Sequence, residues 1–242
     1  MTPMRPILIL TVLLMCSTGV SAQKSIGYHS GATSEQNLRV VANITPYSTG
    51  LGFDDRYQGV KGTPRLFDTL VASSLLIRGE EKYIRLESDL DVVRNTILFI
   101  GSNSGELREI NSEHIAELIF HKDGRDLLFR TTTDVKLDKE IKENKFYEVL
   151  IEGPYQFIKI PDKDFVEADY QRVYSPDRRY DEFKLVSKYY ILGSDSMFHR
   201  IQLTAKSLKK VFPDKKDIID RNFDDKTVSD PEAAVIELLG KF

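Results

Sequence analysis

Short apolar runs separated by turn-forming residues constrain this chain more than any other feature of its sequence. Between residues 66 and 160 these runs are punctuated by charged residues or glycine. Runs of this kind are typical of β-strands, and no helical segment of the length that βαβ units require stands between them. The pattern predicts strands over residues 70–78, 82–86, 96–100, 107–111, 115–121, 126–131, 146–152 and 155–160.

Two of the turns between these strands carry signals of their own. Asp123-Gly124 readily adopts positive φ, so it predicts a tight turn between its neighbouring strands. Glu152-Gly153-Pro154 follows a run of alternating side chains and predicts a second hairpin. The expected fold class is therefore mainly β (α+β): an antiparallel meander sheet, with a partial barrel or a sandwich as its curved forms.

Residues 161–179 are polar and aromatic, and they predict a loop after the last of these strands. Tyr170 and Tyr174 in this loop stand close to Arg178 and Arg179. Because tyrosine and arginine are enriched at protein interfaces, these four residues are a candidate contact surface.

The C-terminal part completes the sheet and then changes to helical spacing. Strands are expected over residues 181–193 and 197–203. Thr204 is placed to cap a helix whose apolar residues recur at intervals of three and four, and Ser229-Asp230-Pro231-Glu232 matches a capping box before a similar run. The spacing predicts two or three short helices packed on the sheet: residues 205–212, residues 214–221 and a segment after the capping box.

The N-terminus has the order of residues found in secretory signal peptides. Arg5 precedes an apolar run that is too short for a permanent membrane anchor, and small residues follow up to Ala22. We expect cleavage between Ala22 and Gln23. The alternative, lipid attachment at Cys16, is disfavoured because Met15 stands where a small residue normally precedes a lipidated cysteine.

Cleavage at this site would remove the only cysteine, so the mature chain would depend on its core alone for stability. The expected organisation is a signal peptide over residues 1–22, an irregular or extended segment over 23–64, an antiparallel β domain over 65–203 and a helical segment over 204–242. No later run is long and apolar enough to be an integral membrane span. The periplasm and the cell surface are the expected locations.

Composition and charge exclude several classes of function. The formal charge is −3, so the whole chain has no electrostatic attraction to nucleic acid. One cysteine and four dispersed histidines offer little for a metal site, and we expect no cofactor. The acidic stretch over residues 87–91 lacks the glycine and the distal glutamate of a calcium-binding loop, so we interpret it as a solvated connector.

No catalytic motif is present. The glycine- and serine-containing segments 101–105 and 193–196 lack the Gly-x-Ser-x-Gly spacing of a nucleophile elbow. His114 and His121 are an odd number of residues apart, so in one strand they would lie on opposite faces and would not share a metal. We therefore expect no catalytic residue and interpret the histidines as exposed or hydrogen-bonded.

Basic residues gather at one place near the C-terminus, where aspartates neutralise part of their charge. One interpretation is a solvated helix face with ion pairs; the other is a docking surface for an acidic partner or a lipid head group. The cluster comprises Arg200, Lys206, Lys209, Lys210, Lys215 and Lys216.

Three phrases together resemble a loosely defined group of exported Bacteroidetes proteins of unknown function: residues 62–67, residues 146–153 and Lys188-Tyr189-Tyr190-Ile191. The resemblance implies a β-rich fold with C-terminal helices and brings no catalytic residues. It also implies O-glycosylation at Asp-Ser/Thr-aliphatic patterns, which here would modify Thr69 and Ser196.

The leading hypothesis is an exported, non-enzymatic envelope protein that acts through protein–protein contacts, with another envelope protein as its partner. The alternative is a small-ligand or lipid-binding sheet, which would need an interior cavity of at least roughly 300 Å³. A hydrolase is a third hypothesis, and it would need a pocket in which two acids, or a histidine and an acid, converge.

Overall fold

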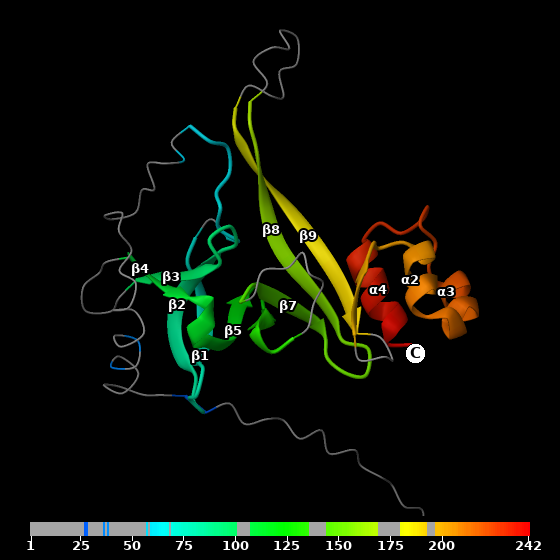
Figure 1. The fold of residues 1–242 in the computed structure, drawn as a ribbon, viewed down its shortest axis with the longest axis horizontal. Helices are drawn as coiled ribbons and strands as arrows, with labels where there is room; N and C mark the ends of the chain where they lie inside the picture. Colours follow the sequence, from blue (N-terminus) through cyan, green and yellow to red (C-terminus); the bar gives the residue numbers. More distant parts are fainter. Residues whose placement is uncertain are drawn as a thin grey trace, which may run out of the picture.

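The computed structural model describes residues 27–28, 36, 38, 57, 59–67, 69–100, 107–135, 144–168, 180–192 and 197–242. Ten strands form one antiparallel sheet, and short helices follow near the C-terminus (Figure 1). The expected mainly β fold class is confirmed. The strands are β1 (Val71–Ile77), β2 (Ile84–Asp91), β3 (Thr96–Ile100), β4 (Leu107–Asn111), β5 (Ile115–Lys122), β6 (Arg125–Thr131), β7 (Phe146–Ile151), β8 (Phe157–Val166), β9 (Glu182–Leu192) and β10 (Phe198–Ile201).

The strand order is β10-β9-β8-β7-β6-β5-β1-β2-β3-β4, so the sheet consists of two meanders joined where β1 pairs with β5. The expected hairpin turns are present within the meanders. Asp123 and Gly124 have φ of 51° and 72°, and Gly153 has φ of 141°. The sequence patterns predicted these local pairings but carried no signal for the β1–β5 pairing, which joins residues far apart in the chain.

The connection from β4 to β5 requires a strongly curled sheet. Only the short 3-10 turn η2 (Ser112–His114) links them, although three strands lie between them in the sheet order. Four residue steps reach about 14 Å at most, whereas four strand spacings in a flat sheet span about 19 Å. β4 must therefore curve back toward β5. Asn95, in the turn between β2 and β3, fastens the curl by donating to Ser112 Oγ at 2.8 Å and accepting from the Phe146 amide at 2.8 Å.

The described residues form three hydrophobic cores, of which the two larger lie at opposite ends of the sheet and the small third includes Tyr147 and Tyr190. The first is built on β1 to β7 around residues such as Leu75, Leu118 and Phe120. The second joins β8 to β10 to the helices, and includes Phe157 and Leu238. Figure 1 shows β1 to β4 at one end of the molecule and the helices at the other.

The helices are α2 (Ala205–Val211), α3 (Lys216–Asn222) and α4 (Pro231–Leu239). Thr204 caps α2 as expected, since its side chain accepts from the Ser207 amide at 3.3 Å. The expected capping box is wrong in detail, because Asp230 is the N-cap of α4 and accepts from the Ala233 amide at 3.1 Å. Glu232 instead turns its side chain toward the sheet. Within the described residues, no helix is long and apolar enough to cross a membrane.

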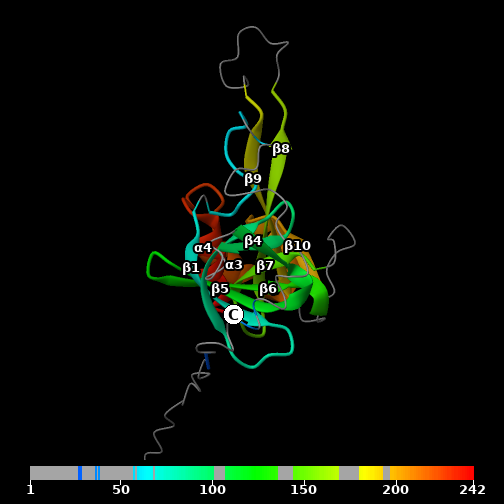
Figure 2. The ribbon, with the colours of Figure 1, turned by 90° about the vertical axis from the view of Figure 1, so that its left-hand side faces the viewer.

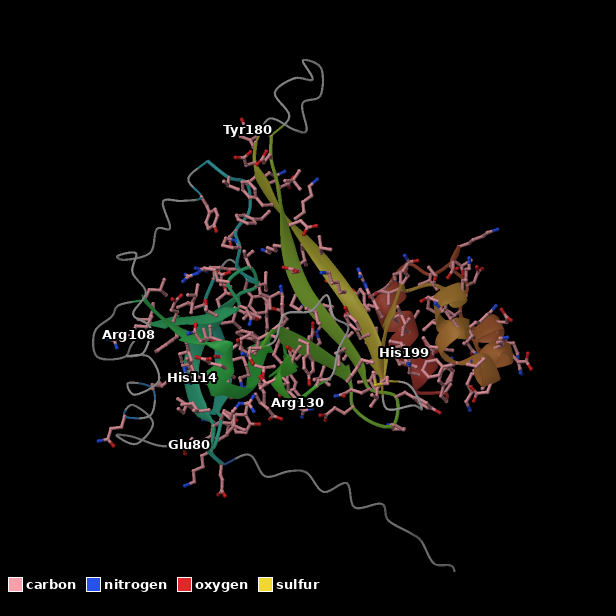
Figure 3. All side chains as sticks on the ribbon, in the orientation of Figure 1. Glu80, Arg108, His114, Arg130, Tyr180 and His199 are labelled. Atoms are coloured by element: carbon pink, nitrogen blue, oxygen red, sulfur yellow. The ribbon has the colours of Figure 1, made fainter. Side chains whose placement is uncertain are left out.

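β8 and β9 form a long hairpin, here called the arm, that projects away from the rest of the sheet (Figures 1 and 2). The expectation of a loop from residue 161 is wrong for residues 161–166, which continue β8. Pro161 is tolerated in this strand because β7 pairs with β8 only up to Lys159. Pro161, which has no N–H to donate, therefore faces an edge of β8 that β7 no longer occupies. Tyr180 lies at the outer end of the described arm (Figure 3).

Residues 59–67, here called the strap, tie the arm to β2. The Lys61 amide donates to Asp181 O at 2.7 Å near the outer end of the arm, and Lys163 Nζ donates to Thr63 O at 2.7 Å. At the other end of the strap, the Leu66 amide donates to Leu90 O at 2.7 Å. The strap thus follows the arm without being a strand of the sheet.

The interpretation of residues 87–91 as a solvated connector is wrong, because β2 continues through them and Asp89 and Asp91 are buried. Their carboxylates accept hydrogen bonds from neighbouring segments of the chain. Asp89 Oδ2 accepts from Arg65 Nε of the strap at 2.9 Å, and Asp91 Oδ1 accepts from the Arg94 amide in the next turn at 2.8 Å. These contacts supply the polar partners that buried carboxylates require.

Candidate functional site

A surface groove opens where β10 separates from β9. The two strands pair as far as Tyr189 and Ile201, after which the chain turns away at Gln202 and enters α2. The separation leaves a cavity of about 570 Å³ between the edge of β9 and the start of α2. The groove therefore forms because β10 leaves the edge of β9 and the chain continues into α2. It lies on the surface at the base of the arm.

The lining of the groove is basic. Lys188 comes from β9, Arg200 from β10 and Lys210 from α2, and no aspartate or glutamate is among the lining residues. Lys188 and Lys210 have no acidic partner in the part of the chain that the structure describes. Ser187 and Ser207 add hydroxyl groups. The groove thus concentrates positive charge in a chain whose formal charge is −3, and it suits an anionic group.

Tyr189, which also lines the groove, is held by a polar network that reaches α4. Its hydroxyl donates to Glu232 Oε2 at 2.8 Å, and Lys159 Nζ lies 3.2 Å from the same oxygen and 2.8 Å from Glu148 Oε2. Burial and the Glu232 hydrogen bond raise the pKa of Tyr189, so the phenol stays protonated. Burial opposes the charge of Lys159, but hydrogen bonds and ion pairing with Glu148 and Glu232 raise its pKa on balance. The network thus joins Tyr189, on the groove, to Glu232 of α4.

The arm above the groove carries exposed apolar side chains. Phe165 is 46% exposed, Leu185 is 58% exposed and Tyr180 is 65% exposed. Phe165 packs edge-on against Phe183 with ring centroids 5.3 Å apart, and Phe183 in turn meets Tyr57. The described residues of the arm therefore combine exposed apolar surface with the basic groove at its base, a composition that suits protein contacts.

A serine, a histidine and an aspartate are aligned across β1, β5 and β6. Ser74 Oγ lies 2.8 Å from His121 Nε2, and His121 Nδ1 lies 2.7 Å from Asp126 Oδ1. This alignment could not be predicted from the sequence, because it depends on the β1–β5 pairing. The order of contacts is that of a Ser-His-Asp triad.

The surroundings of Ser74 do not suit a nucleophile. Ser74 is fully buried, and it lies in the middle of a strand that is paired on both sides, with Arg85 and with Ile119. The sheet therefore uses the neighbouring backbone N–H groups that an oxyanion hole would need. We interpret the three residues as a hydrogen-bonded row that joins adjacent strands.

Most of the site residues expected from the sequence lie outside the described residues. These are the candidate contact residues Tyr170, Tyr174, Arg178 and Arg179, the cleavage residues Ala22 and Gln23, and the glycosylation candidate Ser196. Thr69 is described and is exposed two residues before β1 begins.

The structure separates the basic cluster of the C-terminal segment into two parts. Lys209 forms an ion pair with Asp220 between α2 and α3, as the solvated-face interpretation expects. Arg200 and Lys210 line the groove. Lys188 could not be predicted as their neighbour from the sequence, because it comes from β9 and only the pairing of β9 with β10 brings it to the same place.

No group of three residues that could hold a metal ion occurs among the residues that the structure describes. Comparison with protein-family models, with curated proteins and with solved structures gives no match to this chain.

Proposed function

We propose that this protein is an exported, non-enzymatic binding protein of the cell envelope that acts through contact with another protein. The observation that carries the proposal is the arm, a projecting hairpin with exposed Phe165, Tyr180 and Leu185 and a basic groove at its base. Large apolar side chains that are exposed together on a projecting element form a surface typical of protein–protein contacts. The sequence of residues 1–22 supports the export part of the proposal.

The groove fits the alternative hypothesis of an apolar ligand poorly. Its lining contains three cations and several hydroxyl groups, whereas a lipid tail or an apolar small molecule needs mainly hydrophobic walls. Contact with a charged protein surface is the better match to this chemistry.

Site-specific photo-crosslinking in an exporting bacterium tests the proposal. A photoreactive amino acid replaces Leu185 or Tyr180 on the arm, and the matched control replaces Glu113, an exposed residue of the β4–β5 connection. We expect both arm positions to give an adduct with the same envelope protein and the control to give none. Monomeric, unmodified protein from every position, or identical adducts from the control, contradicts the proposed function.

The export part has its own measurement. Intact-mass analysis of protein from the native host is expected to show a chain that begins at Gln23, and a chain that retains Met1 would contradict export by cleavage. The same spectrum reports added hexose, which is the test of modification at Thr69 or Ser196.

A further inference from the structure

Within the part of the chain that the structure describes, the outer edge of β9 is open between two points where other segments pair with it. Near the end of the arm, the Phe183 amide donates to Lys61 O of the strap at 3.0 Å. At the base of the arm, β10 pairs with Tyr189 and the residues that follow it. Among the described residues, no segment pairs with this edge over residues 184–188, and the groove begins where the open edge ends.

The alternation of the antiparallel ladder shows which backbone groups face this open edge. The Leu192 amide donates to Gln156 O at 2.8 Å, so the even-numbered residues of β9 bond to β8. The odd-numbered residues direct their N–H and C=O groups to the other side, as Phe183 does toward the strap. Leu185 and Ser187 therefore present backbone donors and acceptors to the open edge.

Positively charged side chains lie along the same edge. Lys188, Arg200 and Lys210 line the groove at its base, and Lys184 is an exposed residue of the open stretch. A second copy of this chain that paired through the same edge would bring these positively charged side chains against one another. An acidic strand would meet complementary charge.

We propose that the open edge of β9 and the basic groove together bind an extended, acidic segment of a partner protein, which adds to the sheet as a further strand. Main-chain hydrogen bonds to Leu185 and Ser187 would hold the segment, and its carboxylates would lie beside Lys188, Arg200 and Lys210. This inference rests on the proposed function and specifies the chemistry of the partner. Residues 184–188 provide about 17 Å of edge, the length of a short peptide strand.

The probe is a fluorescent peptide of about eight residues, capped at both ends, that alternates glutamate with valine. The control probe has the same sequence with N-methyl groups on alternate amides, which keeps the charge and prevents strand addition. Fluorescence anisotropy with the mature chain measures both affinities. We expect the unmethylated peptide to bind, and the methylated peptide to bind about tenfold more weakly or not at all.

Two variants of Ser187 separate the backbone from the side chain. Ser187→Pro removes the outward N–H and leaves the bonds to β8, because those come from the even-numbered residues. Ser187→Ala keeps the N–H and removes the hydroxyl. We expect a loss of affinity of about tenfold for the proline variant and about twofold or less for the alanine variant. Thermal unfolding of each variant verifies its fold.

Charge reversal provides a test that does not depend on the proline. The double variant Lys188→Glu with Lys210→Glu is expected to weaken the peptide by more than about tenfold. Lys226→Glu, at an exposed position outside the groove, is the matched control and is expected to change nothing.

The inference is overturned by absence of peptide binding, by equal affinity for the methylated probe, or by equal effects of the two Ser187 variants. Displacement of the peptide by inorganic phosphate, combined with equal binding of the methylated probe, would identify a site for small anions in place of a strand. A crosslinked envelope partner without peptide binding would contradict this inference alone and leave the proposed function standing.

Discussion

At the scale of the residue, Asp89 shows how a buried charge joins two segments. Its carboxylate accepts from Arg65 Nε at 2.9 Å and from the Phe67 amide at 3.0 Å, both in the strap. Burial nevertheless raises its pKa to about 6, against the hydrogen bonds and the Arg65 charge that lower it. The folded protein therefore binds this proton more tightly than the unfolded chain does.

The raised pKa of Asp89 sets the sign of a pH effect. Because the ordinary value is 3.8, the stabilising effect of protonation is present at low pH and is lost as the pH rises from about 4 to about 6. Relative to Asp89→Asn, which cannot titrate, the wild type should lose about 3 kcal/mol of unfolding free energy across this range. Urea unfolding at a series of pH values measures it. Asp164→Asn, at an exposed position, should keep the wild-type slope, and parallel curves for wild type and Asp89→Asn would refute the prediction.

At the scale of the element, α4 is fastened to the arm by both apolar packing and the polar network under Tyr189. Lys159 is only 19% exposed and lies between Glu148 and Glu232. Lys159→Met leaves Glu148 as a nearly buried carboxylate without its cation, so we expect a loss of about 2–3 kcal/mol in unfolding free energy. This is less than the loss for a fully buried ion pair, because both side chains keep some contact with solvent. Hydrogen exchange should become faster in α4.

The control for Lys159 is Lys241→Met, which breaks the exposed pair with Glu237 one helical turn away. Because solvent screens that pair, no measurable change in stability is expected. Equal losses for the two variants would show that the network under Tyr189 has no special role in attaching α4.

The elements themselves could be predicted from the sequence because their signals are local. Asp123-Gly124 marks a turn wherever it is placed, and the spacing of Leu208 from its apolar neighbours marks a helix face without reference to the sheet. The prediction failed at Pro161, where tolerance depends on which strand lies alongside. The groove could not be predicted either, since Lys188 and Lys210 meet only after β9, β10 and α2 are in place.

At the scale of the whole molecule, the two larger hydrophobic cores share one sheet, and we expect them to lose structure separately. Leu238 belongs to the core under the helices and Leu75 to the core of β1 to β7. Leu238→Ala should cost about 3 kcal/mol and speed hydrogen exchange in α2 to α4 while β1 to β5 stay protected. Leu75→Ala should do the reverse. Uniform acceleration of exchange in both variants would mean that the sheet unfolds as one unit.

The pairing of β1 with β5 also determines the order in which the chain can complete its structure as it emerges from the ribosome. β1 emerges first and can form a hairpin with β2 at once, but Ser74 and His121, whose side chains are hydrogen-bonded across the β1–β5 junction, are 47 residues apart. Until β5 follows, one edge of β1 remains without its partner, and an unpaired edge of this kind invites association with other chains. The short β4–β5 connection limits this interval, because it delivers β5 beside β1 as soon as the curl of β2 to β4 has formed.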